Sequence, residues 1–269
     1  RHRLPLVASL LVFILGASPV LVWAVVEQLT AVGFPEPLAV ALILMAASSP
    51  IVSCVAIALF VGLDAALAIV AVLLATALVP LTLPGIAHAL AGVALDISVA
   101  TFMLRLAVLV GSAFAAAWLV RRFAGEAALS RRRELIDGIA VLNLVVFALA
   151  IMDGVTAFAL ARPGYAAVAL VAAFAFNLLL QAAAWLAFRA LGPRRALTAA
   201  LLAGNCNMGL VLVALEGTGS FEVTVFFALA QIPMYTLPAL LAPLYRRALG
   251  ATGGDAATLL DGLGGEFLG

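Results

Sequence analysis

Two short polar stretches interrupt long apolar segments and contain the side chains with the clearest potential for binding chemistry. The first reads AASSPIVSC and the second AGNCNMG, so serine hydroxyls and asparagine amides occur beside residues that break helices. Hydroxyl and amide oxygens can ligate a cation or hydrogen-bond a polar solute. The predicted solute- or ion-binding residues are Ser48, Ser49, Ser53, Thr76, Asn205, Asn207 and Gln231, and the predicted break residues are Pro50, Gly204 and Gly209.

Each of these polar residues also has a purely structural interpretation. Asn205 and Asn207 can satisfy backbone groups that a break sets free, and serines let helices approach closely. Polar contacts between membrane helices average well below about 1 kcal/mol and are common. The occurrence of two polar stretches favours the ligand interpretation for the asparagines, whereas the serines are balanced between the two roles.

Arg105 is the one arginine placed deep in an apolar segment, eight residues from the start of the segment 97–120. Its long side chain can extend to the membrane surface or pair with another group. The alternative is a charge that attracts anions on the approach to a binding site. His2 and His88 fall in termini or loops, so no metal site and no catalytic base is expected. An enzyme would need such groups at similar depth, and the chain is predicted not to be one.

The elements that carry these residues are membrane-spanning helices. Hydrophobic residues make up 67% of the 269-residue chain and charged residues only 10%. Apolar segments of about 20 residues, the length that crosses the hydrocarbon core, recur along it. The pattern predicts an all-α polytopic membrane protein rather than a β-barrel, whose strands alternate in polarity. The predicted spans are 4–28, 37–61, 65–83, 97–120, 135–152, 165–188, 197–215 and 221–245.

Arginines predict the orientation of these spans, because short cytoplasmic loops are enriched in positive charge. Basic residues cluster before the first span, in alternate loops and after the last span, while the intervening loops carry mostly acidic residues. Both termini are therefore predicted to be cytoplasmic, in a multi-pass protein of the cell's cytoplasmic membrane. Residues 1–247 form one predicted transmembrane domain, and the Gly-rich residues 248–269 are predicted to be a disordered cytoplasmic tail.

The two polar stretches belong to repeated units. Each broken span is followed by a span with the tripeptide Thr-Leu-Pro near its end, 33 residues after Ser49 and 30 residues after Cys206. The predicted orientation inserts the two units in opposite senses, with a partial first repeat at 1–96 and a second at 97–247. Inverted repeats with paired broken helices are typical of secondary transporters, whose sites lie at the membrane midplane.

With these motifs, the chain resembles the bile acid:sodium symporter superfamily, which also contains arsenite efflux permeases. The resemblance covers all eight spans and is carried by the Pro50 break, by Pro80 and Pro84, and by the N-x-G-L motif of 207–210. It implies a ten-helix transporter with two inverted repeats, whose fourth and ninth helices are broken and cross. The chain would then lack the first two family helices, as Arg1 in place of Met also indicates.

The chain departs from the sodium-dependent members at both breaks. Where they carry a Pro-Gly-Gly-Thr-Ala-Ser-Asn run, this chain reads PIVSCVA, and their acidic residue before the second break is replaced by Leu202. The loss of these oxygen ligands argues against sodium as the coupling ion, and no cofactor is expected. The predicted function is alternating-access transport of a small organic anion or similar solute. The predicted partners are that solute and the bilayer, with no nucleic acid; a truncated, channel-like or receptor-like member is the alternative.

Overall fold

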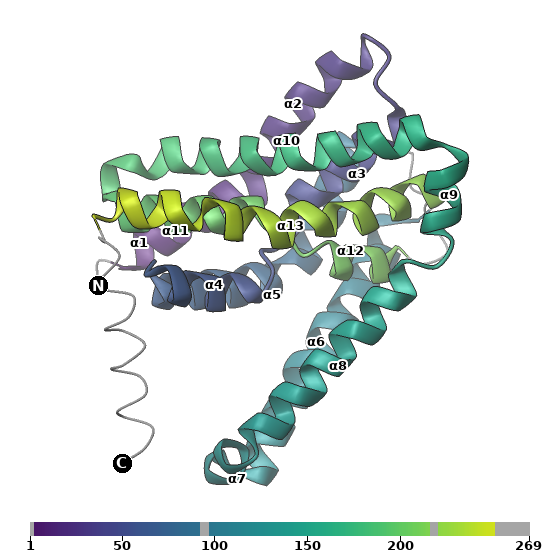
Figure 1. Ribbon diagram of the computed structural model, residues 1–269. Helices are drawn as coiled ribbons and strands as arrows, with labels where there is room; N and C mark the ends of the chain where they lie inside the picture. The colour runs from purple at the N-terminus through teal and green to yellow at the C-terminus, as the bar shows by residue number, and fades with distance from the viewer. Residues whose placement is uncertain (1–2, 92–96, 216–219, 251–269) are drawn as a thin grey trace.

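The computed structural model describes residues 3–91, 97–215 and 220–250, and these residues form helices joined by short connections (Figure 1). The predicted tail from 251 onward lies outside the described residues. The elements are α1 (Arg3–Val12), the π-helix η1 (Phe13–Ala17), α2 (Ser18–Thr30), α3 (Glu36–Ala47), α4 (Ser53–Val61), α5 (Ala65–Leu90), α6 (Val99–Ala124), α7 (Glu126–Arg131), α8 (Arg133–Ile151), α9 (Val155–Ala161), α10 (Pro163–Phe188), the 3-10 helix η3 (Arg189–Leu191), α11 (Pro193–Gly204), α12 (Met208–Ala214) and α13 (Phe221–Ala248).

The described residues contain six helical runs that are long and apolar enough to cross a membrane. They are Leu4–Thr30, Ala65–Leu90, Val99–Ala124, Arg133–Ala161, Pro163–Leu191 and Phe221–Ala248. The two other predicted spans are each divided into a pair of short helices, α3 with α4 and α11 with α12. The chain is thus an all-α polytopic membrane protein, and both predicted helix breaks are confirmed.

Local sequence explains where several helices begin and end. Asp64 and Ser98 precede α5 and α6, and their side chains accept hydrogen bonds from the amides of Leu67 and Thr101 at 3.0 and 3.1 Å. Such caps satisfy amide groups that have no partner within the helix. Helix α4 ends before Gly62, which adopts the left-handed conformation with φ 84°. A residue with a Cβ rarely accepts this conformation.

The expected end of the third span near Thr82 is wrong, because α5 continues through Pro80 and Pro84 to Leu90. Helix α13 likewise contains the second Thr-Leu-Pro tripeptide in its interior. The threonine of each tripeptide donates to the carbonyl four residues before it, from Thr82 to Leu78 at 3.3 Å and from Thr236 to Ile232 at 2.8 Å. Membrane helices tolerate proline where side chains and neighbouring helices compensate for the freed backbone groups.

Helices α6 and α8, connected by α7, form a long hairpin whose α7 end extends away from the other helices (Figure 1), while α6 also packs against α5 and α12. Only 11% of the most apolar stretch of α6 is buried, and only 6% of the corresponding stretch in the run that contains α8. In the other four long runs, 39 to 50% of that stretch is buried. In the rest of the molecule, α10, α11 and α13 pack together, and α3 contacts α5 and α13. The two breaks lie within this more tightly packed part.

Helix α10 approaches the end of α11 closely at Gly204. A Cβ built on this glycine would lie 2.5 Å from Gln181 Cγ and 3.0 Å from the carbonyl oxygen of Asn177. Gly209 is similarly confined, since a Cβ there would lie 2.9 Å from the ring of Phe147. Gly204 is therefore required for packing against α10, whereas the Phe147 ring beside Gly209 could shift to make room.

We predict that Gly204→Ala lowers stability by about 1–3 kcal/mol, because the added methyl group must displace backbone as well as side-chain atoms. The matched control is Gly85→Ala in α5, where a Cβ would meet nothing within 4 Å. Alanine is the better helix former, so this variant is expected to be neutral or slightly more stable. Thermal unfolding in detergent measures both, and equal unfolding temperatures for the two variants would contradict the packing argument.

Candidate functional site

The two helix breaks meet and pair through their backbones. The amide of Ile51 donates to the carbonyl of Asn205 at 2.8 Å, and the amide of Asn207 donates to the carbonyl of Ser49 at 2.7 Å. These bonds flank an antiparallel bridge between Pro50 and Cys206. Unpaired backbone groups cost several kcal/mol each in hydrocarbon, so each break supplies partners that the other requires.

Side chains satisfy other carbonyl groups near the end of α11. Asn205 Nδ2 donates to the carbonyl of Leu201 at 2.8 Å, and Asn177 Nδ2 donates to that of Gly204 at 2.7 Å. The thiol of Cys206 lies 3.4 Å from the carbonyl of Ala203. The carbonyl of Leu201 also keeps its helical bond from the amide of Asn205 at 3.3 Å, whereas the carbonyls of Ala203 and Gly204 are freed by the break and accept from these side chains instead.

The serines of the first break are buried and serve mainly to close it. Ser48 Oγ donates to the carbonyl of Met45 at 2.8 Å, at the end of α3, and Thr76 Oγ1 donates to Ser49 Oγ at 3.2 Å. Ser48 and Ser49 are completely buried. Ser53 is partly buried at the start of α4, and its hydroxyl has no hydrogen bond to any described residue.

Asn205 is only partly satisfied by hydrogen bonds with the described residues. Its side chain is completely buried, and Oδ1 receives no hydrogen bond from the described residues. An unpaired buried acceptor costs about 1–3 kcal/mol, so a bound donor at this position would recover that free energy. Asn205 therefore combines a structural role through Nδ2 with an available acceptor at Oδ1.

A cavity of about 360 Å³ lies beside the second break. Asn207 and Gln231 provide its polar side chains together with the hydroxyl of Tyr235. Asn207 Oδ1 also accepts from the amide of Leu210 at 3.2 Å and caps α12, and Gln231 Nε2 donates to the carbonyl of Phe227 at 3.3 Å. The remaining lining residues are Ile51, Leu109, Phe147, Met208, Gly209, Leu210, Val213 and Met234.

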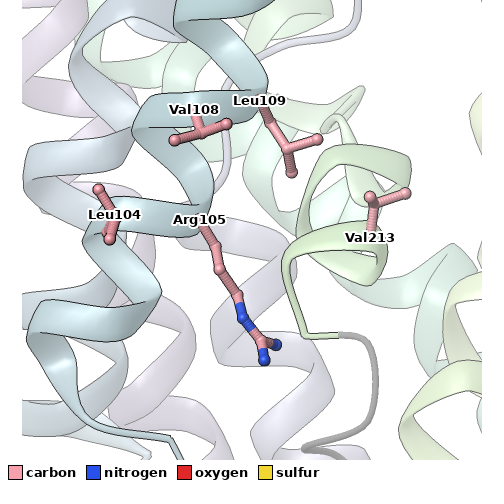
Figure 2. A pocket seen from close by; sticks show the side chains of 5 residues that line it. All are labelled: Leu104, Arg105, Val108, Leu109 and Val213. Atoms are coloured by element: carbon pink, nitrogen blue, oxygen red, sulfur yellow. The ribbon is translucent and has the colours of Figure 1, made fainter.

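Arg105 lies beside this cavity rather than within it. Its side chain extends from α6 toward the C-terminal end of α12, where Nη1 donates to the carbonyl of Ala214 at 3.3 Å (Figure 2). Arg105 is one of the residues that line a second cavity of about 510 Å³, and that cavity shares Leu109 and Val213 with the first. A positive charge at the negative end of a short helix is electrostatically favourable.

The structure thus groups the predicted residues in three places. At the junction, Ser48, Ser49 and Asn205 are buried, with the partly buried Thr76 and Ser53 beside them. Asn207 and Gln231 line the adjoining cavity, and Arg105 lies next to that cavity. Tyr235, Met234 and Phe147 were not predicted as lining residues. Only the amphiphilic character of Tyr235 gave any signal, because apolar residues of a cavity and of a lipid-facing surface look alike in the sequence.

Comparison with protein-family models and with curated proteins finds no match for this chain. Within the described residues, no group of three His, Cys, Asp or Glu side chains is placed to hold a metal ion. The chemical groups at the site are instead neutral amides and hydroxyls beside one guanidinium group. This combination is suited to hydrogen-bonding a polar solute and to attracting negative charge.

We predict that Asn207→Ala weakens the start of α12 by about 1 kcal/mol, because it removes the acceptor of the Leu210 amide. Asn207→Ser keeps an oxygen that can cap the helix and should retain most of the stability. Hydrogen exchange of residues 208–214, followed by mass spectrometry, measures the effect locally. Unchanged protection of this segment in the alanine variant would show that Asn207 does not act as its cap.

Proposed function

We propose that this protein is a secondary transporter that moves a small organic anion or similar solute across the cytoplasmic membrane by alternating access. The observation that carries this proposal is the pairing of two helix breaks through Ile51 with Asn205 and Asn207 with Ser49. Paired interruptions at corresponding positions of two helices are characteristic of transporter sites. The breaks adjoin a cavity that is large enough for a small solute.

The proposal includes an inverted repeat and membership of the bile acid:sodium symporter superfamily. Its support is the matched order of a broken span and a proline-containing span in each half, with the equivalent bonds of Thr82 to Leu78 and Thr236 to Ile232. The arginine distribution supports an orientation with both termini in the cytoplasm. Crossing of the two broken helices would bring their termini and the solute together at the midplane.

Sodium is not proposed as the coupling ion. The carbonyls of Leu201, Ala203 and Gly204 accept hydrogen bonds from protein side chains, and Leu202 occupies the position of the family's acidic residue. Hard cations are bound by about six oxygen ligands, often including a carboxylate. The available oxygen of Asn205 is better suited to a hydrogen-bond donor on the solute.

Solute flux into proteoliposomes tests the proposal with a panel of radiolabelled organic anions. We expect saturable uptake that is unchanged when potassium replaces sodium, and about tenfold weaker apparent affinity in Asn205→Ala, as for a lost hydrogen bond. The control, Asn143→Ala, removes an exposed amide from α8 that lies outside the site. Absence of flux across the panel would count against transport, and strong sodium-driven uptake would overturn the assignment of coupling.

We predict that Arg105→Gln raises the KM for an anionic solute by about tenfold, because it removes the guanidinium charge beside the cavity. Arg105→Lys keeps the charge and should recover much of the loss, while uptake of a neutral solute of similar size should change little. The comparison of KM values for the charged and neutral solutes is the measurement. If Arg105→Gln raised both KM values equally, Arg105 would act in packing or at the end of α12 rather than in attracting an anion.

A further inference from the structure

A chain of buried polar side chains leads from the end of α13 to the second helix break. The hydroxyl of Tyr245 donates to Gln181 Oε1, and Gln181 Nε2 donates to Asn177 Oδ1 at 2.6 Å. Asn177 Nδ2 then donates to the carbonyl of Gly204 at 2.7 Å. These side chains are 3 to 5% exposed, so the hydrogen bonds lie within the protein rather than at its surface.

These hydrogen bonds all donate in one direction, from Tyr245 toward the second break. Tyr245 acts as the first donor, and each amide uses its oxygen to accept and its nitrogen to donate toward the break. The last acceptor is the carbonyl of Gly204, the final residue of α11, which a continuous helix would have paired with an amide four residues later. Asn177 on α10 therefore gives the carbonyl of Gly204 a hydrogen bond in place of the one that the break removes.

Packing at Gly204 reinforces the same junction. Gln181 Cγ and the oxygens of Asn177 lie so close to Gly204 that a Cβ there would meet them at 2.5 to 3.0 Å. Helices α10, α11 and α13 are thereby joined by both hydrogen bonds and close backbone approach. The α6–α8 hairpin is much less buried, since only 11% and 6% of its most apolar stretches are buried.

We infer that Asn177, Gln181 and Tyr245 are positioning residues, which hold the end of α11 against α10 and α13 and so keep the second break in place. The inference rests on the proposed function in one respect, since transport is the activity for which the break is positioned. None of the three residues lines the cavity beside the break. Their effect on a solute must therefore pass through Gly204 and its neighbour Asn205.

The two native cysteines provide a probe of this role that does not depend on transport. Cys54 and Cys206 are the only cysteines of the chain, and both are buried at the breaks. The thiol of Cys54 lies 3.9 Å from the carbonyls of Leu201 and Asn205, so it too reports on the end of α11. Labelling of such thiols by a membrane-permeant maleimide requires local opening, and its rate follows the population of the opened state.

The experiment compares Tyr245→Phe and Asn177→Leu with Tyr165→Phe in the reconstituted full chain. Tyr165 is a matched control because its hydroxyl donates to the carbonyl of Glu222 at 3.4 Å, away from the break. We expect maleimide labelling of Cys54 and Cys206, resolved by peptide mass spectrometry, to be about threefold faster in the first two variants. The control should label at the wild-type rate, and the thermal unfolding of Tyr245→Phe should resemble that of the control.

Transport kinetics separate positioning from general packing. In Tyr245→Phe we expect a higher KM with little change in the maximal rate, because a displaced break binds solute less well. Wild-type labelling rates in both Tyr245→Phe and Asn177→Leu would overturn the inference, whatever the transport result. If no solute is transported by any variant but labelling rises as expected, the proposed function fails and the positioning role stands.

Discussion

The requirement that backbone polar groups be paired within the membrane governs the centre of this protein. Two broken helices expose amides and carbonyls where water is not available to bind them. The bonds from Ile51 to Asn205 and from Asn207 to Ser49 satisfy four of these groups, and they make each break dependent on the other. The junction therefore pairs most of the groups that the breaks set free, and the side-chain oxygen of Asn205 remains without a donor among the described residues.

Most polar side chains around the junction have hydrogen-bond partners within the protein. Ser48, Thr76 and Asn177 form hydrogen bonds at the ends of the broken helices, and Asn207, which lines the adjoining cavity with Gln231, also caps α12. Each buried polar group that is paired avoids a desolvation penalty, and at the junction Asn205 Oδ1 is the buried side-chain oxygen that no described residue pairs.

The helices and their interruptions are the features best predicted from the amino-acid sequence. Apolar segments of sufficient length predicted the spans, and the Pro50 and Gly204–Gly209 stretches correctly predicted both breaks. The end of α5 was predicted too early, because side chains and the packing of neighbouring helices compensate for proline and the helix continues beyond Thr82. The cavity residues Phe147 and Tyr235 also escaped prediction, since burial against a cavity leaves no periodic signal in a uniformly apolar helix.

The apolar character of the spans, their helical class and the positions of the breaks can be predicted from the residues alone, because they follow from local hydrophobicity and backbone preferences. The contacts between distant groups are seen only in the folded chain: Pro50 lies opposite Cys206, Arg105 reaches the end of α12, and Tyr245 connects through two amides to Gly204. These contacts join residues far apart in the chain. Their selection depends on how whole helices pack and on which freed backbone groups lack a partner, and neither is encoded in any single segment.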